Sequence, residues 1–296
     1  MPLNFKKKDI MKKQEVAFSG KCRAVISDID GTFLTNGKQL IPKNLEAIAV
    51  ARRMGVPFIF ATGRMYASIL PWVEMLGLEA PQILNNGANV ILPATQAHIA
   101  HFCLLPDAVR LIDEEARNKH FVPIYFSGNG IYAEETPAEA WMIERNNESI
   151  SVAGRELIDG RLGEIEKIVI LAQERCGELA ELAKYLNGRG EAENLGINAR
   201  FSETGILNIN SIMATKREGI KAVCKYLGFS PADVMAVGDG DNDADMLASV
   251  GLGVAMGNAT PLSRQAALTQ VGDNEHAGLA QAITAFVIKQ DFSTIK

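Results

Sequence analysis

The sequence predicts an α/β protein in which a doubly wound parallel sheet is interrupted by an inserted α+β domain. Two observations support the sheet: short apolar runs recur along the chain, and patterns of amphipathic helix lie between successive runs. A third observation supports the insertion, because the middle of the chain has a different pattern of apolar and polar residues.

The predicted strands of the parallel sheet are short runs in which nearly every residue is apolar. Continuous apolar character is typical of strands that are buried on both faces of a parallel sheet. Aspartate, threonine, asparagine or glycine follows each run, and functional residues of such sheets lie at the carboxyl ends of the strands. The runs cover residues 23–27, 56–61, 82–84 and 234–237.

The predicted helices between these strands carry apolar residues at helical spacing. Pro42 begins the first helix, at a position where proline is favoured because the first turn leaves its N–H groups unpaired. The helices cover residues 42–54, 65–76 and 216–227.

In the middle of the chain, several predicted strands alternate apolar and polar residues, which is typical of an antiparallel sheet with one solvated face. These strands, at 98–104, 122–126, 165–172 and 200–208, are interspersed with polar helices at 106–119 and 174–187. We therefore predict an N-terminal arm at 1–20, a core formed by 21–88 and 209–296, and an inserted domain at 89–208.

Composition and charge exclude several classes of protein. Of 296 residues, 47% are hydrophobic and 22% charged, so the chain can bury a core and is not disordered. The net charge of −5 provides no basic field for nucleic acid or anionic lipid. No apolar stretch approaches the roughly 18 residues of a membrane span, and the basic N-terminal arm lacks the apolar run of a signal peptide. We expect a cytoplasmic protein that acts on a small molecule, without nucleic-acid or membrane partners.

Cysteine and histidine do not form a recognisable site. His98 and His101 are three residues apart in a predicted strand, a spacing that puts them on opposite faces, so we expect no histidine metal site. The cysteines are far apart and include no C-x-x-C pair, so we predict buried thiols rather than disulfides or a zinc site. They are Cys22, Cys103, Cys176 and Cys224.

Asp28 and Asp30 follow the first predicted strand and are separated by one residue. Alternate residues of a strand point to the same side, and two carboxylates in one small volume repel each other unless a cation lies between them. Oxygen ligands without a nearby histidine or cysteine suit Mg²⁺. An ordinary polar turn would also explain these two residues if they stood alone.

Two other positions are suited to bind an anion. Thr62 and Gly63 follow the second strand and precede a helix, where a hydroxyl and unpaired N–H groups can hold phosphate, although turn and capping chemistry is an alternative. Lys216 begins a predicted helix, where a cation is disfavoured, so it needs an anionic partner unless it is a solvated surface residue.

A cluster of acidic and amide residues, 238–243, follows the fourth strand. Helix capping accounts for one or two of these side chains but not for all of them. Asp239 and Asp243 share a face if a helix begins there. We assign no role to Asp241 and expect it to face solvent.

Together, these motifs resemble those of the haloacid dehalogenase (HAD) superfamily of phosphotransferases, and they occur in the same order. The motifs are Asp28-Ile29-Asp30-Gly31-Thr32, Thr62-Gly63-Arg64, Lys216, and Gly238-Asp239-Gly240-Asp241-Asn242-Asp243. The closer resemblance is to Cof-type phosphatases, which carry a type-IIB cap between the second and third motifs; segments 85–88, 254–259 and 274–278 also resemble that subfamily. The resemblance implies a Rossmann-like core and a cap.

The resemblance also implies a role for each matching residue. Asp28 would be the nucleophile that forms an aspartyl-phosphate, and Asp30 the general acid and base. Mg²⁺ would be held by the Asp28 carboxylate, the main-chain carbonyl of Asp30 and Asp239, with Asp243 in a supporting position. The phosphoryl group would be bound by Thr62, Gly63, Lys216 and Asn242.

The resulting expectation is a Mg²⁺-dependent phosphatase that hydrolyses a small phosphorylated metabolite, such as a sugar phosphate. The alternatives are a phosphomutase on the same scaffold and, less favoured, a non-catalytic module that binds a phosphorylated ligand. The inserted domain would select the substrate by closing over the site. Its candidate residues are Tyr125, Ser127, Asn129, Tyr132 and Arg145.

Overall fold

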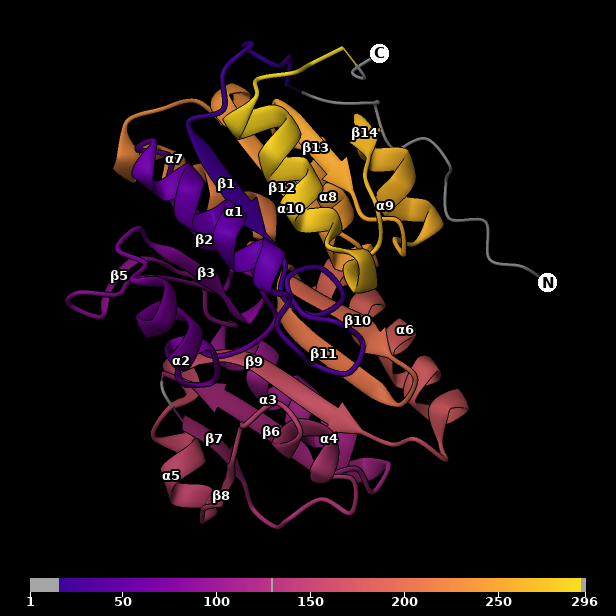
Figure 1. The fold of residues 1–296 in the computed structure, drawn as a ribbon. Helices are drawn as coiled ribbons and strands as arrows, with labels where there is room; N and C mark the ends of the chain where they lie inside the picture. Colours follow the sequence, from indigo (N-terminus) through magenta and orange to yellow (C-terminus); the bar gives the residue numbers. More distant parts are fainter. Residues whose placement is uncertain (1–15, 129, 294–296) are drawn as a thin grey trace.

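A computed structural model describes residues 16–128 and 130–293 and contains two large sheets at opposite ends of the molecule (Figure 1). Most of the predicted N-terminal arm, and Asn129 of the predicted cap residues, lie outside the described residues. The α/β fold with an inserted α+β unit is confirmed.

One of the two sheets, called here the core sheet, has five strands in the order β14-β13-β12-β1-β2, and all neighbouring pairs are parallel. Helices cover both faces: α1 and α10 lie on one side, while α7, α8 and α9 lie on the other (Figure 1). The strands are β1 (Ala24–Ser27), β2 (Phe58–Phe60), β12 (Val234–Gly238), β13 (Leu252–Ala255) and β14 (Thr269–Gln270). The helices are α1 (Pro42–Arg53), α2 (Tyr66–Leu76), α7 (Lys216–Leu227), α8 (Ala244–Ala248), α9 (Pro261–Ala266) and α10 (Gly278–Ala282), which continues as a π-helix over Ile283–Ile288.

Strand β1 is an interior strand of the core sheet, because it pairs with β12 on one side and with β2 on the other. Val25 and Ile26 are fully buried, and burial of each such side chain stabilises the fold by about 1.5–3 kcal/mol. The chain leaves the sheet directly after Ser27. This packing carries Asp28 to the carboxyl end of the sheet, beside the end of β12.

A small antiparallel sheet joins the core sheet to the rest of the chain. It consists of β3 (Gln82–Leu84), β4 (Asn89–Leu92) and β5 (Ala97–His101). The assignment of residues 82–84 to the parallel sheet is therefore wrong, since β3 meets that sheet only through one parallel bridge between Ala61 and Ile83. Val90 of β4 packs into the core cluster, and we propose that the inserted unit begins after β5 rather than at residue 89.

The second large sheet, called here the cap sheet, has six strands in the order β10-β11-β9-β6-β7-β8. The segment 200–208, predicted as one strand, instead contains the turn of a hairpin at which Gly205 has a φ of +81°. The strands are β6 (Pro123–Ser127), β7 (Gly130–Ala133), β8 (Ile150–Val152), β9 (Ile165–Leu171), β10 (Ile197–Glu203) and β11 (Ile206–Ser211).

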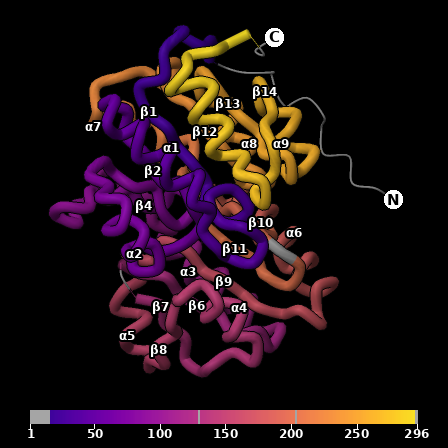
Figure 2. Tube along the Cα trace, in the orientation of Figure 1, coloured from indigo at the N-terminus to yellow at the C-terminus, as the bar shows by residue number. Residues whose placement is uncertain are grey.

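The two faces of the cap sheet have different environments. Helices α3 (Pro106–Asn118) and α6 (Cys176–Ala192) cover the outer face and bury Ile168 and Ile170 of β9. The tube in Figure 2 shows how the chain passes from the core into this sheet and returns to the core along β11. The short helix α5 (Arg155–Asp159) lies near β7 and β8, and the short helix α4 (Trp141–Glu144) lies beside β6 (Figure 1).

A buried polar network joins the cap sheet to the small sheet. The carboxylate of Glu166, which is fully buried, accepts hydrogen bonds from Asn85 Nδ2 (2.6 Å), Asn89 Nδ2 (2.7 Å) and His101 Nε2 (2.9 Å). The predicted placement of His98 and His101 on opposite faces is wrong, because their ring centroids are 4.7 Å apart. A shift in the register between β4 and β5 is the physical reason, since it restores both imidazoles to the same side.

We expect the thermal stability of the protein to decline as the pH rises from about 6.5 towards 10. Hydrogen bonds to Cys103 and to Glu166 outweigh burial and raise the pKa of His101 to about 10. A group with a raised pKa stabilises the folded state fully below its unfolded pKa and loses that contribution as the pH passes its folded pKa. Calorimetric Tm values between pH 6 and 10 measure the effect. The variant His101→Gln should show a flatter dependence, and an unchanged slope would contradict this assignment.

No helix in the described ranges is long and apolar enough to cross a membrane. The prediction that the cysteines are buried holds for Cys224 alone, since Cys22, Cys103 and Cys176 are partly exposed. All four are free thiols in the structure.

Candidate active site

A cavity of about 650 Å³ lies between the carboxyl end of the core sheet and the inner face of the cap sheet. The core contributes most of the residues predicted from the motifs, and the cap sheet contributes the opposite wall. The predicted residues that line the cavity are Asp28, Asp30, Thr62, Gly63, Lys216, Asp239 and Asn242. The tertiary structure therefore brings together side chains from four separate segments of the chain.

Asp28 lies at the end of β1, and its backbone N–H donates to the carbonyl of Val237 in β12 (2.9 Å). Its Oδ1 accepts a hydrogen bond from Lys216 Nζ at 2.5 Å. Lys216 begins α7, is fully buried at its side chain, and also donates to Asp243 Oδ1 at 2.6 Å. The expected anionic partner of Lys216 is thus confirmed as two carboxylates.

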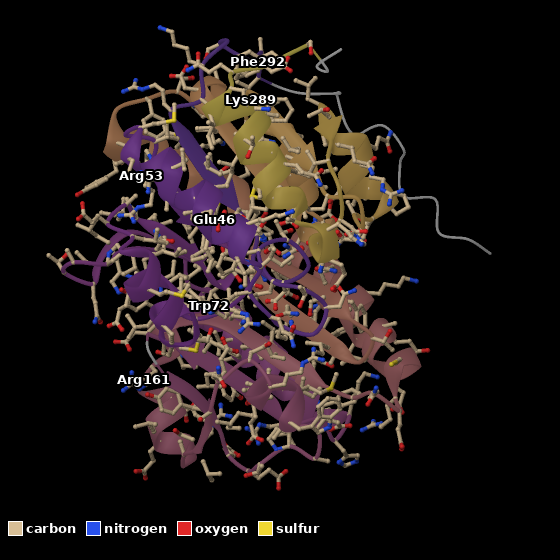
Figure 3. The ribbon with its side chains drawn as sticks, viewed as in Figure 1. Glu46, Arg53, Trp72, Arg161, Lys289 and Phe292 are labelled. Carbon is tan, nitrogen blue, oxygen red and sulfur yellow. The ribbon has the colours of Figure 1, made fainter. Side chains whose placement is uncertain are left out.

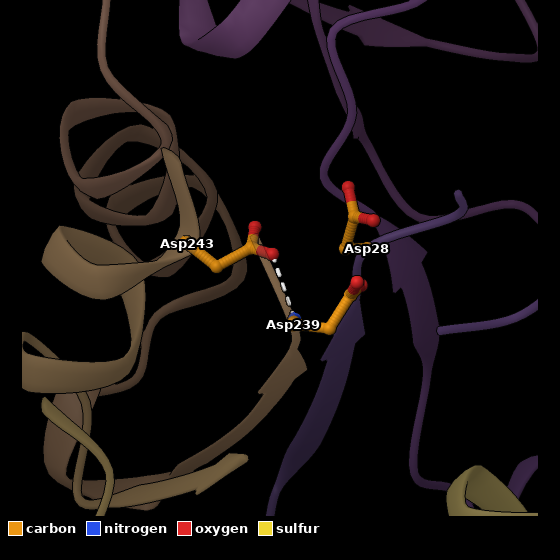
Figure 4. Close-up of side chains that lie close together, drawn as sticks. All are labelled: Asp28, Asp239 and Asp243. Carbon is orange, nitrogen blue, oxygen red and sulfur yellow. Dashed lines mark hydrogen bonds between the residues drawn. The ribbon is translucent and has the colours of Figure 1, made fainter. Parts of the chain in front are cut away.

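Asp28, Asp239 and Asp243 form a group of three carboxylates, each with an oxygen within 4.8 Å of the others. Figure 4 shows Asp28 and Asp239 approaching each other from the ends of β1 and β12, with Asp243 beside them. Oδ2 of Asp243 accepts from the backbone N–H groups of Asp239 and Gly240, both at 2.9 Å. Asp243 therefore holds the loop and the lysine, and it does not line the cavity itself.

Gly31 allows Asp239 to approach the end of β1. The glycine has a φ of +86°, and a Cβ there would lie 2.3 Å from Asp239 Oδ2. Thr32 Oγ1 donates to Asp239 Oδ1 at 2.7 Å, and Asn258 Nδ2 donates to the other oxygen at 3.2 Å. The backbone N–H of Asn274 in turn donates to Asn258 Oδ1 at 3.1 Å and orients that amide.

The electrostatics of this group disfavour three free carboxylates. Burial raises the pKa of Asp28 well above its ordinary value; Lys216 opposes the shift, while Asp243 and Asp239 add to it. Burial and the neighbouring Asp243 raise the pKa of Asp239 to about 6. The cluster therefore favours the binding of a further positive charge.

The donor set of this cluster fits a magnesium ion. The three carboxylates offer oxygen ligands alone, as hard divalent cations prefer, and a charge of +2 would relieve the repulsion that raises the pKa of Asp28 and Asp239. Asp28 and Asp239 have oxygens directed to the cavity, whereas the oxygens of Asp243 are already engaged by Lys216 and two backbone N–H groups.

Asp30 does not join the carboxylate cluster, contrary to the expectation that it shares one small volume with Asp28. Its Oδ2 accepts from Arg64 Nε at 2.7 Å and its Oδ1 from Arg64 Nη2 at 2.6 Å, while Lys38 Nζ also donates to Oδ1. Burial alone would raise the pKa of Asp30, but Arg64 and Lys38 outweigh it and lower the pKa to about 2. Attraction to these two cations is the physical reason for its orientation.

Thr62 and Gly63 lie between β2 and α2, as predicted. Thr62 is buried, and its Oγ1 accepts from the backbone N–H of Arg64 at 3.2 Å. Asn242 Nδ2 donates to Asn86 Oδ1 at 3.1 Å, so the fourth motif meets the loop after β3 beside Gly63.

Gly87 brings the loop after β3 against the start of α7. Its φ is +96°, and a Cβ would lie 2.0 Å from the Thr215 carbonyl oxygen. Only glycine tolerates both this backbone conformation and this close approach. Thr215 caps α7 by accepting from the Glu218 backbone N–H at 3.1 Å, and the cap fixes the point from which Lys216 extends.

Sequence reasoning left four residues of the site without a role. Arg64 stood within the second motif, and its guanidinium carbon also lies 5.2 Å from the ring centroid of Trp72, which is labelled on α2 in Figure 3. Asn258 stood within a segment that resembled the subfamily. Lys38 lies in an irregular loop in which the sequence showed no functional motif. Thr32 was noted as part of the first motif, but its contact with Asp239 depends on a residue 207 positions away.

Among the candidate cap residues that the structure describes, Arg145 alone lines the cavity. Tyr125 is directed to the helix-covered face, where its hydroxyl donates to Asp113, because alternate residues of β6 point to opposite sides. Ser127 is buried, and Tyr132 lies under the guanidinium of Arg161, 5.2 Å from the ring centroid. Asp241 is exposed, as expected, although it lines the rim of the cavity.

The sequence model of one family, described as haloacid dehalogenase-like hydrolase, matches residues 25–283. The chain belongs to this family. The predicted resemblance to this superfamily is thereby confirmed, and the chain shares its fold, including the cap, with a solved structure of HAD subclass IIB. The chain is an enzyme, an HAD-type phosphomonoester hydrolase.

Relatives of this HAD hydrolase match along most of their length. A pyridoxal phosphate phosphatase, YbhA, from Escherichia coli (strain K12) is 28% identical over 283 residues, which cover 90% of this chain and 99% of the relative. An HMP-PP phosphatase from Shigella flexneri is 29% identical over 244 residues, covering 82% of this chain and 86% of the relative.

Solved structures share the fold of this HAD hydrolase. A haloacid dehalogenase-like hydrolase from Bacteroides thetaiotaomicron has a TM-score of 0.79 and 26% identity, covering 89% of this chain and 98% of its own. A sugar phosphatase of HAD subclass IIB has a TM-score of 0.76 and 22% identity, with coverage of 89% and 98%. The latter similarity supports the fold, including the cap.

Proposed function

We propose that this HAD hydrolase is a Mg²⁺-dependent phosphatase that cleaves a small phosphorylated metabolite through an aspartyl-phosphate on Asp28. The observation that carries the proposal is the pairing of a buried Asp28 with Lys216 at the end of β1. The Thr62–Gly63 turn and the cap sheet enclose the same cavity.

Phosphate binding is assigned to the loop ends that surround Asp28. Thr62 and the N–H of Gly63 lie in the turn just before α2, where backbone donors attract a phosphate oxygen. Lys216 neutralises charge on the transferring group and holds the Asp28 carboxylate in position. Asn242 donates a further hydrogen bond from the opposite loop.

In the first half-reaction, an oxygen of Asp28 attacks phosphorus while the bond from phosphorus to the leaving oxygen breaks. Asp30 supplies the proton that the leaving oxygen takes up. In the second half-reaction, Asp30 takes a proton from water, the water oxygen bonds to phosphorus, and the bond from phosphorus to Asp28 breaks. The products are an alcohol and inorganic phosphate.

The contacts of Asp30 set a condition on this cycle. With a pKa of about 2, Asp30 is ionised and ready to act as a base in the second half-reaction. Its action as an acid requires Arg64 and Lys38 to move away from it, because their positive charges keep the Asp30 carboxyl group deprotonated. Arg64 Nη1 also donates to the Asn146 carbonyl of the cap at 3.3 Å, so motion of the cap is coupled to this ion pair.

We assign the metal to Asp28, Asp239 and the main-chain carbonyl of Asp30, with Asp243 in support. A magnesium ion bound there supplies positive charge that stabilises the transferring phosphoryl group. The chain's own contribution is to hold the two carboxylates: Lys216 fixes Asp28, while Thr32 and Asn258 fix Asp239.

The substrate is proposed to be a phosphate ester of a sugar or a similar small metabolite. The relatives that act on pyridoxal phosphate and HMP-PP support a small organic phosphate, and the cavity of about 650 Å³ has room for such a leaving group. Four free thiols accord with a cytoplasmic location, where cysteines stay reduced.

Removal of divalent metal is expected to abolish phosphate release. The enzyme is treated with EDTA, dialysed, and assayed with p-nitrophenyl phosphate before and after addition of Mg²⁺. We expect kcat to fall by at least about a hundredfold and to recover on addition of Mg²⁺, because the charge of the metal would no longer stabilise the transferring phosphoryl group. Undiminished turnover without metal would refute the metal assignment. A phosphomutase would instead convert a hexose phosphate into its isomer without stoichiometric release of phosphate.

A further inference from the structure

The wall of the cavity opposite the catalytic aspartates carries five polar side chains and Val169 on three neighbouring strands of the cap sheet. Asn210 of β11 pairs with Lys167 of β9 on one side and Asn198 of β10 on the other. In the adjacent row, Asn208 pairs with Val169 and Arg200. Side chains directly opposite each other on paired strands share a face, and all six of these line the cavity.

The polarity of this wall is local. Further along the same face, the cap sheet is apolar: Ile124 and Phe126 of β6 and Ile131 of β7 form a buried cluster with Met142. Polar side chains are concentrated where β9, β10 and β11 lie over the cavity, beside Val169 and Ile206 of the same apolar cluster. A sheet face that presents polar groups to an active site is suited to contact a polar ligand there.

Arg200 differs from the other cations that line the cavity. Within the described ranges, its guanidinium is exposed and makes no hydrogen bond or ion pair. The remaining cations have partners: Lys38 and Arg64 contact Asp30, Lys216 contacts two aspartates, Lys167 donates to the Gly63 carbonyl at 3.1 Å, and Arg145 donates to the Met142 carbonyl.

The strand neighbours of Arg200 add uncharged hydrogen-bonding groups, the amides of Asn198 and Asn208. Asn208 is held by a hydrogen bond from its Nδ2 to Ser202 Oγ at 2.8 Å, which directs its amide along the wall. Asn198 lies in the adjacent row of the same strand, two residues before Arg200. A planar guanidinium flanked by amides matches the oxygens of a phosphate or carboxylate, which Arg binds through two parallel hydrogen bonds.

We propose that Arg200, with Asn198 and Asn208, forms a subsite for a second anionic group, a phosphate or a carboxylate, on the leaving-group part of the substrate. The inference rests on the proposed phosphatase function. The phosphoryl group that is hydrolysed already has Lys216, Thr62 and Gly63 around it, so the unpaired cation on the opposite wall serves another group. A second anionic group on the leaving part thus distinguishes preferred from poor substrates.

Two matched pairs of substrates test the subsite. Glycerol 3-phosphate and 3-phosphoglycerate differ in a hydroxymethyl group against a carboxylate; glucose 6-phosphate and glucose 1,6-bisphosphate differ in a second phosphate. We expect kcat/KM to favour the member with the second anion in at least one pair. In Arg200→Gln that preference should fall on the order of ten- to a hundredfold, with the partner lacking the second anion unaffected. The pair that responds identifies the anion as carboxylate or phosphate.

Two further variants separate direct contact from general electrostatics. Arg200→Lys keeps the charge and should retain part of the preference. Lys184→Gln removes a charge from α6, on the other side of the cap sheet, and should leave the preference unchanged. If Arg200→Gln and the unaltered enzyme preferred the substrate with the second anion equally, the subsite would be overturned. Arg200 would then serve as a charge that keeps the edge strand β10 from pairing with another chain.

Binding keeps this test independent of turnover. Calorimetric Kd values for both pairs, measured with Mg²⁺ in an Asp28→Asn background with and without Arg200→Gln, report the subsite even if the unaltered protein releases no phosphate. A Kd preference that depends on Arg200 would then support the subsite while the proposed function fails. A preference independent of Arg200 would overturn the subsite alone.

Discussion

Asp28→Asn is expected to abolish phosphate release from p-nitrophenyl phosphate, with kcat reduced by at least about a thousandfold. The amide has nearly the shape of the carboxylate but is a far weaker nucleophile. The fold should persist, because burial already disfavours the charge of Asp28 and Lys216 keeps its second partner, Asp243. Steady-state kinetics with saturating Mg²⁺, and a Tm equal to or above that of the unaltered protein, are the measurements.

Asp241→Asn is a matched control for this substitution. It removes one carboxylate at the rim of the same cavity, from an exposed residue to which no role is assigned. Its kcat should stay close to that of the unaltered enzyme. If Asp28→Asn retained full activity, or if both variants lost activity equally, Asp28 would not be the nucleophile.

Lys216→Met is expected to lower both activity and stability. The methionine fills a similar volume, but Asp28 and Asp243 lose the single cation that both contact. Removal of one partner from a buried ion pair typically destabilises a protein by about 3–5 kcal/mol, because the remaining charge is buried without compensation. We expect urea unfolding without metal to show a loss of this size and kcat with Mg²⁺ to fall at least about a hundredfold.

The double variant Lys216→Met/Asp243→Asn separates the two effects. The asparagine oxygen can still accept from the N–H groups of Asp239 and Gly240, while one of the uncompensated charges is gone. Stability should therefore recover in part while activity stays low. A double variant as unstable as Lys216→Met would show that the loss comes from packing rather than from buried charge.

Much of the fold was predictable because elements that are buried in the fold have characteristic local patterns of apolar residues. Strands enclosed on both faces, such as β1 and β12, consist of consecutive apolar residues, and α7 has the predicted bounds. The edges were less predictable. The hairpin of β10 and β11 turns at Gly205, and β3 pairs with β4, because a short apolar run does not by itself specify whether its partner is the core sheet or the next strand along the chain.

The candidate site divides in a similar way. The positions of Asp28, Lys216 and Asp239 followed from motifs that each lie within a few residues of a strand or helix end. The orientation of Asp30 did not, since Arg64 is 34 residues away and Lys38 belongs to a loop without a recognisable pattern. Which side chain a carboxylate contacts is decided by the energy of the whole arrangement.

The sequence by itself determined which groups are proposed to react and the order in which they occur, because strand ends, turns and helix starts are local features with local residue preferences. Only the tertiary structure decided which of those groups touch: the two cations on Asp30, the lysine shared by Asp28 and Asp243, and the unpaired Arg200 on the opposite wall. Contacts of this kind depend on strand register and on how the cap sheet packs over the core. Both are properties of the assembled chain.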